Sequence, residues 1–193
     1  HHHHPHHPHP LRLHRLLYRR KATYVELLYS FVTGGRREPI RLPRTYMTFY
    51  DFDHGEGRFE DAAPSIEAMQ MDPSASTDAY LPSQTELKTY SSWAAFLVAK
   101  TGSASLINEV IPDPADQQRL LSWNTSVYTA TTYGVGEDNP IDTYDMTKTQ
   151  KQRSIMIQFT NVTSFKVRYA IIGCCTTGRN FLYRCAHAVP NAR

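Results

Sequence analysis

The chain has 193 residues, 40% hydrophobic and 20% charged, so it is long enough for one domain with an apolar core and is not disordered throughout. Its net charge of +3 is the sum over two regions of unlike charge. Residues 1–21 carry five basic side chains and no acidic one, whereas the other residues carry 16 basic and 18 acidic side chains. This mildly acidic remainder argues against nucleic-acid binding by the domain. The sequence has no apolar run of the roughly 20 residues needed to cross a bilayer, so we expect no integral membrane segment.

Residues 1–20 are interpreted as a disordered tail, and residues 21–193 as a single domain. The stretch His1–His9 holds seven of the ten histidines, separated by prolines, and such a composition cannot build a core. Clustered imidazoles can bind metal, but this stretch implies no fixed geometry. Leucines and arginines at near-helical spacing in residues 11–20 fit either a short basic amphipathic helix or a solvated segment.

The first half of the domain is predicted to consist mainly of strands. Residues 24–32 form the first strand and end at a Gly34-Gly35 turn, and residues 45–52 are dense in aromatic and β-branched side chains. Loops rich in proline and small polar residues then surround shorter strands at residues 66–71, 86–90 and 93–99. The last of these also fits a helical turn.

One short helix is predicted in the second half, at residues 115–121. Asp113 is suited to cap its N-terminus, and Pro114 is suited to its first position. The Thr, Tyr and Val content of residues 123–133 predicts another strand.

The clearest pattern lies in residues 153–172. Ile155, Ile157 and Phe159 alternate with polar or flexible residues, and a second alternating series follows a polar break at residues 161–164. It runs through Phe165, Val167, Tyr169 and Ile171, with Lys166, Arg168 and Ala170 on the opposite, solvated face. We interpret the segment as a hairpin of half-buried strands. The fold class predicted is all-β, an antiparallel β-sandwich of jelly-roll type with one or two short helices.

Two acidic loops that contain glycine are candidate metal sites. Carboxylates in flexible loops are the ligands that Ca²⁺ prefers, and the candidate ligands are Asp51, Asp53, Asp138 and Asp142. The spacing departs from an EF-hand, because Gly55 stands where a third ligand belongs. The alternative interpretation is that Asp, Asn and Gly simply form turns between strands.

Three cysteines lie near the end of the chain. The short spacing would let Cys185 form a disulfide with Cys174 or Cys175 in an oxidising compartment, and a reducing one would leave three thiols. A zinc site with His187, or a Cys185–His187 catalytic pair, can also be drawn. However, adjacent thiolates suit tetrahedral zinc poorly, and no orienting third residue can be identified.

Two sequons, at Asn124 and Asn161, fit N-glycosylation and, with the cysteines, favour an extracellular or cell-surface location. Aromatic side chains could stack on a glycan, with Trp93 and Trp123 as the main candidates. The alternative is that these residues, with Tyr128, Tyr133 and Tyr144, belong to the core and to cross-strand pairs.

Several short motifs together resemble uncharacterised jelly-roll-like β-sandwich modules of algal and bacterial secreted or surface proteins. They are Pro43–Asp53, Gly134–Pro140, Thr147–Ser154 and Gly178–Phe181. The resemblance spans residues 24–185 and implies an extracellular module without known catalysis. It transfers no functional residues.

Three functions are compatible with these features. The first is a noncatalytic extracellular module for binding or adhesion, with a glycan or a surface protein as partner and Ca²⁺ as a candidate cofactor. The second is a polysaccharide hydrolase that uses paired carboxylates such as Glu56 and Glu137. The third is a structural subunit of a larger surface assembly, which would expose an apolar patch or an unpaired edge strand.

Overall fold

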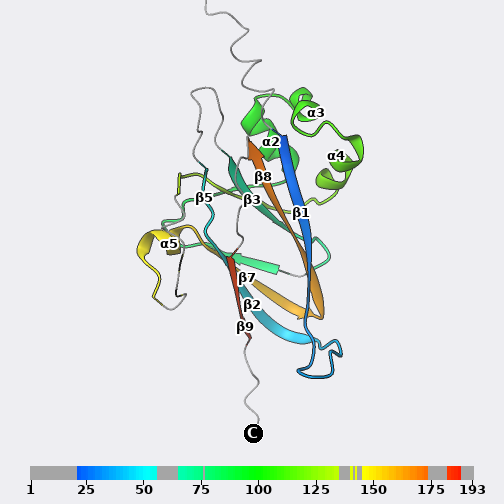
Figure 1. Cartoon of the computed structure of the whole chain (residues 1–193), viewed down its shortest axis with the longest axis vertical. Coiled ribbons are helices and arrows are strands. Elements are labelled where there is room, and N and C mark those ends of the chain that lie inside the picture. Colours follow the sequence, from blue (N-terminus) through cyan, green and yellow to red (C-terminus); the bar gives the residue numbers. More distant parts are fainter. Residues whose placement is uncertain are drawn as a thin grey trace, which may run out of the picture.

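The computed structural model describes residues 21–55, 65–75, 77–134, 140, 142, 145–173 and 182–187, with side chains for all of these but 21, 106, 182 and 185–187. They form two antiparallel sheets packed face to face (Figure 1), which confirms the predicted β-sandwich. The five-stranded sheet has the order β1 (Lys21–Ser30), β8 (Ser164–Gly173), β3 (Ile66–Met71), β6 (Val127–Ala130), β5 (Leu87–Tyr90). The four-stranded sheet has the order β4 (Thr77–Tyr80), β7 (Ile155–Val162), β2 (Leu42–Tyr50), β9 (Leu182–His187).

The strand pairing is nested, as in a jelly roll. β1 pairs with β8, β2 with β7 and β3 with β6, so strands from the first half of the chain pair with strands taken in reverse order from the second half. The chain thus behaves as one long antiparallel ribbon that is folded over into two sheets. The helices between β5 and β6 connect two strands that also pair with each other.

The predicted hairpin of residues 153–172 is wrong in one respect, because β7 and β8 lie in different sheets. The alternation is confirmed on β7, where Ile155, Ile157 and Phe159 are buried, and in the first half of β8. It is wrong in the second half of β8, where Arg168 and Ala170 are buried as well, because helices cover the face that was expected in water. The two series face each other across the sandwich, with the rings of Phe159 and Phe165 stacked at 3.8 Å. A period of two reports which face of a strand is buried, but it does not report which strand lies beside it.

The main core fills the space between the sheets. Met47 and Phe49 on β2 and Ile157 on β7 meet Val167 and Tyr169 on β8, and all five are almost fully buried. The alternate positions of β2 and β7 turn away from this core. Two-faced strands of this kind account for the alternating sequence pattern.

A second core covers the outer face of the five-stranded sheet. It is formed by three helices, α2 (Trp93–Thr101), α3 (Ile107–Val110) and α4 (Pro114–Leu121), with the short 3-10 helix η1 (Ala104–Leu106) between α2 and α3. Figure 1 shows α2, α3 and α4 gathered at one end of the molecule, beside β8 and β1. A further short helix, α5 (Lys148–Gln152), precedes β7. The described residues therefore contain more helix than the sequence predicted.

Residues 93–99 form part of α2, so the strand interpretation was wrong and the helical alternative is correct. The hydroxyl of Ser92 caps the helix by accepting from the N–H of Ala95 at 3.2 Å, and Gly102 ends it with a left-handed φ of 81°. The predicted capping of α4 is confirmed, since the Asp113 carboxylate accepts from the N–H of Ala115 at 2.7 Å. In the parts of the chain that the structure describes, no helix is long and apolar enough to cross a membrane.

Candidate functional site

The acidic residues predicted to bind Ca²⁺ have different environments. Asp51 follows β2 with a left-handed φ of 66° and is half-buried, Asp53 is buried, and Asp142 is exposed. Asp138 lies outside the described residues. Among the residues that are described, no group of three or more His, Cys, Asp or Glu side chains is arranged to hold a metal ion. Ca²⁺ binding at the four aspartates stays a prediction.

Several other predicted residues lie partly or wholly outside the described residues. They are Cys174, Cys175, Tyr144, Glu56 and Glu137, and the side chains of Cys185 and His187. The backbone of residues 185 and 187 belongs to β9 and pairs with β2. The disulfide, the zinc site, the Cys–His pair and the pair of glutamates therefore stay predictions.

The asparagines of both sequons are exposed. Asn124 lies in the loop between α4 and β6. Asn161 lies near the end of β7 with a left-handed φ of 56°, where the chain crosses from one sheet to the other. Glycosylation at these two exposed side chains stays a prediction.

The two tryptophans differ in exposure, and both contact other side chains of the fold. Trp93 is fully buried in the second core, with its ring 5.4 Å from that of Phe96, so it cannot stack on a ligand. Trp123 is half-buried, and one face of its ring is covered by the guanidinium of Arg168 at 3.8 Å. Tyr128 is buried and Tyr133 is half-exposed. The core interpretation therefore holds for Trp93 and Tyr128.

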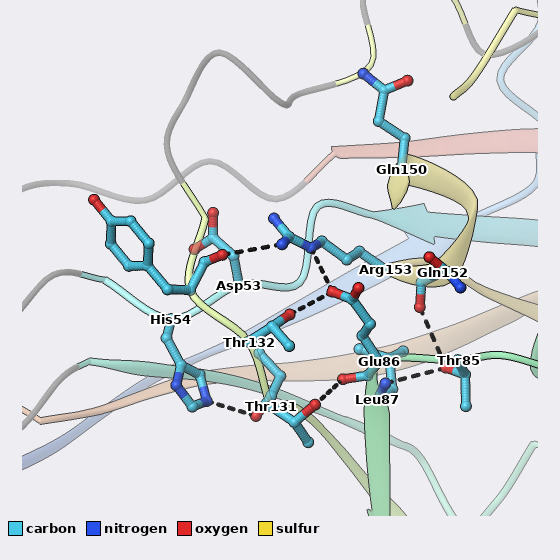
Figure 2. A network of polar contacts seen from close by, with 12 residues as sticks. Asp53, His54, Thr85, Glu86, Leu87, Thr131, Thr132, Gln150, Gln152 and Arg153 are labelled. Atoms are coloured by element: carbon cyan, nitrogen blue, oxygen red, sulfur yellow. Dashed lines mark hydrogen bonds and ion pairs between the residues drawn. The ribbon is translucent and has the colours of Figure 1, made fainter. Parts of the chain in front are cut away.

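A network of polar side chains joins several segments at one end of the sandwich (Figure 2). Arg153, just before β7, donates from Nε to Glu86 at 2.8 Å and from Nη2 to the carbonyl of Tyr133 at 2.9 Å. Thr132 donates its hydroxyl hydrogen to the same Glu86 carboxylate. This hydroxyl is the main reason that the pKa of Glu86 is lowered, and Arg153 lowers it further.

The loop after β2 is tied into the same network. The N–H of Asp53 donates to the Glu67 carboxylate at 3.4 Å, and the ring of His54 contacts the carbonyl of Ala130 at 2.7 Å. Gly134 leaves room for these groups, because an added Cβ would overlap an Asp53 carboxylate oxygen and lie 2.7 Å from an Arg153 nitrogen. The network thus links the ends of β2 and β6 with the starts of β3, β5 and β7, which is a structural role.

A second buried charge lies under α4. Arg168 on β8 was expected in water, but it is only 1% exposed because the helices cover this face of the sheet. Its guanidinium donates to the carbonyl of Leu120 at 3.0 Å and to Glu26 at 2.9 Å. Glu26 also accepts from Lys166 at 2.9 Å, and this bond is the main cause of its lowered pKa. The arginine therefore binds α4 and β1 to the outer face of β8.

The edge strand β1 has several exposed apolar side chains. Its residues Val25, Leu27 and Leu28 are 43%, 37% and 63% exposed, and Val32, just beyond it, is 45% exposed. β1 pairs with β8 on one side, and it has no strand on the other side among the described residues. A run of exposed apolar side chains along an unpaired strand is typical of an interaction surface.

Two of the other edge strands, β4 and β5, are protected in ways that β1 is not, and the remaining edge strand among the described residues, β9, has six residues. β4 and β5 have only four residues each, and they carry Asp78 and Lys88, whereas β1 has ten residues. Between Ala22 and Ser30 the only charged side chain of β1 is Glu26, and it is bound to Lys166 and Arg168. Short strands and free charges are the usual means of preventing edge-to-edge pairing.

A groove of about 580 Å³ runs beside this edge. Five consecutive residues of β1, from Ala22 to Glu26, form one wall, and Asp116 and Arg119 of α4 form the other. The hydroxyl of Tyr24 donates to Asp116 at 3.1 Å and fixes α4 against the strand. The groove thus leaves space next to the edge of β1. A second groove, of about 350 Å³, includes Asn124 and Tyr128 and lies away from β1.

Sequence reasoning identified β1 as a strand but not as an exposed edge. Apolar residues occur on both of its faces, at Val25, Leu27 and Leu28, and this pattern is typical of a strand buried on both sides. The signal that was available is the lack of clean alternation in a sandwich whose other long strands alternate.

A comparison of the chain with protein-family models, curated proteins and solved structures found no match.

Proposed function

We propose that this protein is a noncatalytic structural subunit that joins a larger assembly through the edge of β1. The observation that carries the proposal is an unpaired strand of ten residues with Val25, Leu27 and Leu28 exposed on it. Burial of each such side chain in a contact contributes about 1 kcal/mol or more. A strand added to the edge would also satisfy backbone groups that water now solvates.

The buried polar groups support a structural role. Arg153 with Glu86, and Arg168 with Glu26, form ion pairs that bind segments of the fold to one another. Neither of the two grooves described above includes Arg153 or Glu86. A jelly roll by itself does not determine function, so the proposal depends on the edge of β1 and not on the fold.

The test is the concentration dependence of the molecular mass of the full chain, measured by sedimentation velocity and light scattering. We expect self-association that Leu28→Lys weakens about tenfold, because a charge enters an apolar strand pair in every copy. The control is Tyr80→Lys, which puts the same charge at a 46% exposed position of the edge strand β4. It should associate like the wild type.

The proposal is wrong if the full chain stays monomeric at every concentration, or if Leu28→Lys and Tyr80→Lys associate equally well. Circular dichroism and thermal unfolding of both variants show that the substitutions leave the fold intact. Leu28 is 63% exposed, so we expect a change in melting temperature of no more than about 2 °C.

A further inference from the structure

The backbone groups at the free edge of β1 belong to its even-numbered residues. The N–H of Asp72, just after β3, donates to the carbonyl of Lys166 at 3.1 Å, so even-numbered residues of β8 turn their backbone groups toward β3. The odd-numbered residues of β8 then bond to β1, where Tyr169 lies opposite Val25. The N–H and C=O groups directed away from β8 are therefore those of Ala22, Tyr24, Glu26 and Leu28.

We infer that this edge binds β1 of a second copy of the chain in antiparallel orientation, with Val25 of each copy on the two-fold axis. The inference rests on the proposed function and names both the partner and the register. The five-stranded sheets of the two copies then form one continuous sheet. The four even-numbered residues of each copy exchange about eight backbone hydrogen bonds in this arrangement.

The register follows from the sizes of the side chains. On the outer face, Leu28 of one copy lies opposite Ala22 of the other, so the most exposed apolar side chain of β1 meets its smallest. On the inner face, Leu27 lies opposite Thr23 and Val25 lies opposite Val25. Large side chains therefore face small or equal ones at every apolar position, which permits close cross-strand packing.

Charge and apolar contact both disfavour the neighbouring registers. An axis at Glu26 would place the two Glu26 carboxylates opposite each other, and like charges at such a position are destabilising. An axis at Leu27 would place Glu26 opposite the apolar Leu28. An axis at Tyr24 would leave Leu28 without a partner within β1. The register centred on Val25 is the one that avoids all three faults.

The groove beside β1 supports the same arrangement. Its wall includes Arg119, which is exposed and close enough to Tyr24 to lower the pKa of that phenol, although burial and Asp116 raise it more. In the register centred on Val25, Glu26 of the second copy lies opposite Tyr24 and thus near Arg119. Asp116 is already engaged by the hydroxyl of Tyr24 at 3.1 Å. Arg119 therefore places a positive charge on the wall of the groove near the incoming Glu26, which also keeps the ion pairs with Lys166 and Arg168 of its own copy.

Disulfide cross-linking of the full chain tests the register. Odd-numbered residues of β1 form the non-hydrogen-bonded pairs of the new interface, with Cα atoms about 4.5 Å apart, a distance that a disulfide can span. We expect Val25→Cys to form a disulfide with itself between copies. We also expect Thr23→Cys to link to Leu27→Cys when the two variants are mixed, and neither to link to itself.

Peptide mapping by mass spectrometry, with and without reduction, identifies these links and separates them from any that involve the three native cysteines. If Leu28→Lys weakens association but Val25→Cys never links to itself, the proposed function stands and the symmetric pairing is wrong. If Val25→Cys does not link and the chain is also monomeric, both proposals are wrong. Arg119→Glu should weaken association at least fivefold in the inferred arrangement, and an unchanged affinity would contradict it.

Discussion

The guanidinium of Arg168 lies 3.8 Å from the centroid of the Trp123 ring, and this contact holds the segment after α4 against the outer face of β8. The same arginine donates to Leu120 in the last turn of α4. Arg168 therefore connects the helical layer to the sheet.

Replacement of Trp123 by alanine should lower the free energy of unfolding by about 2 kcal/mol, because it removes a half-buried ring and the cation–π contact with Arg168. Trp123→Phe keeps an aromatic face and should cost about half as much. Urea denaturation followed by circular dichroism measures both variants. Equal stability of Trp123→Ala and the wild type would show that the contact contributes nothing.

Replacement of Gly134 by alanine should destabilise the protein by about 2 kcal/mol, because the new Cβ would overlap the Asp53 carboxylate and the Arg153 guanidinium. The matched control is Gly34→Ala, where an added Cβ meets nothing within 4 Å and φ is not left-handed. Thermal unfolding should place Gly34→Ala within about 0.5 kcal/mol of the wild type. A similar loss in both variants would contradict the close packing at Gly134.

Substitution of Glu86 by glutamine should change how stability depends on pH. The pKa of Glu86 is lowered from its ordinary value of 4.5 by the hydroxyl of Thr132 and then by Arg153. Its carboxylate therefore stabilises the fold fully above pH 4.5, and this stabilisation is lost as the pH falls through the lowered pKa. Glu86→Gln should be less stable than the wild type at pH 7, and the difference should shrink below pH 4.5.

Melting temperatures of both proteins between pH 7 and pH 3 provide the measurement. The pKa of Glu26 is lowered as well, but this carboxylate is present in both proteins, so its effect cancels in the comparison. A difference between the two proteins that stays constant through acid pH would show that the Glu86 carboxylate has no linked stabilising role.

Both sequons should be glycosylated when the full chain is expressed through a secretory pathway, because Asn124 and Asn161 are exposed. Treatment with a peptide N-glycosidase should lower the mass, and each single Asn→Gln substitution should remove one glycan. Asn108 is an exposed asparagine outside any sequon, so Asn108→Gln serves as the control. An unchanged mass after treatment would contradict the accessibility of both sites.

The fold class could be predicted because alternation and turn chemistry are local. The strands at residues 24–32 and 66–71 and the capping of α4 by Asp113 were predicted close to their observed bounds. The partner strands of β7 and β8 could not be predicted, since the two strands lie in different sheets and their neighbours come from distant parts of the chain. The strand of residues 123–133 was placed correctly but is shorter in the structure, at Val127–Ala130.

The site was harder to predict because burial on the outer face of a sheet depends on distant helices. Arg168 sits at an alternating polar position of β8, and only the packing of α2 to α4 removes it from water. Similarly, the apolar residues on both faces of β1 set this strand apart, but they do not show that one of its edges lacks a partner strand. Whether a strand lies at the edge of a sheet depends on the topology, and the local sequence pattern does not determine it.

The nested pairing also has a consequence for synthesis. Tyr29 on β1 and Tyr169 on β8 are 140 positions apart, so β1 leaves the ribosome long before its neighbour in the sheet exists. Contacts of such long range make folding slow and leave early strands exposed to other nascent chains. Chains growing side by side on one messenger RNA would therefore present their first strands to one another while both edges of each strand are still open.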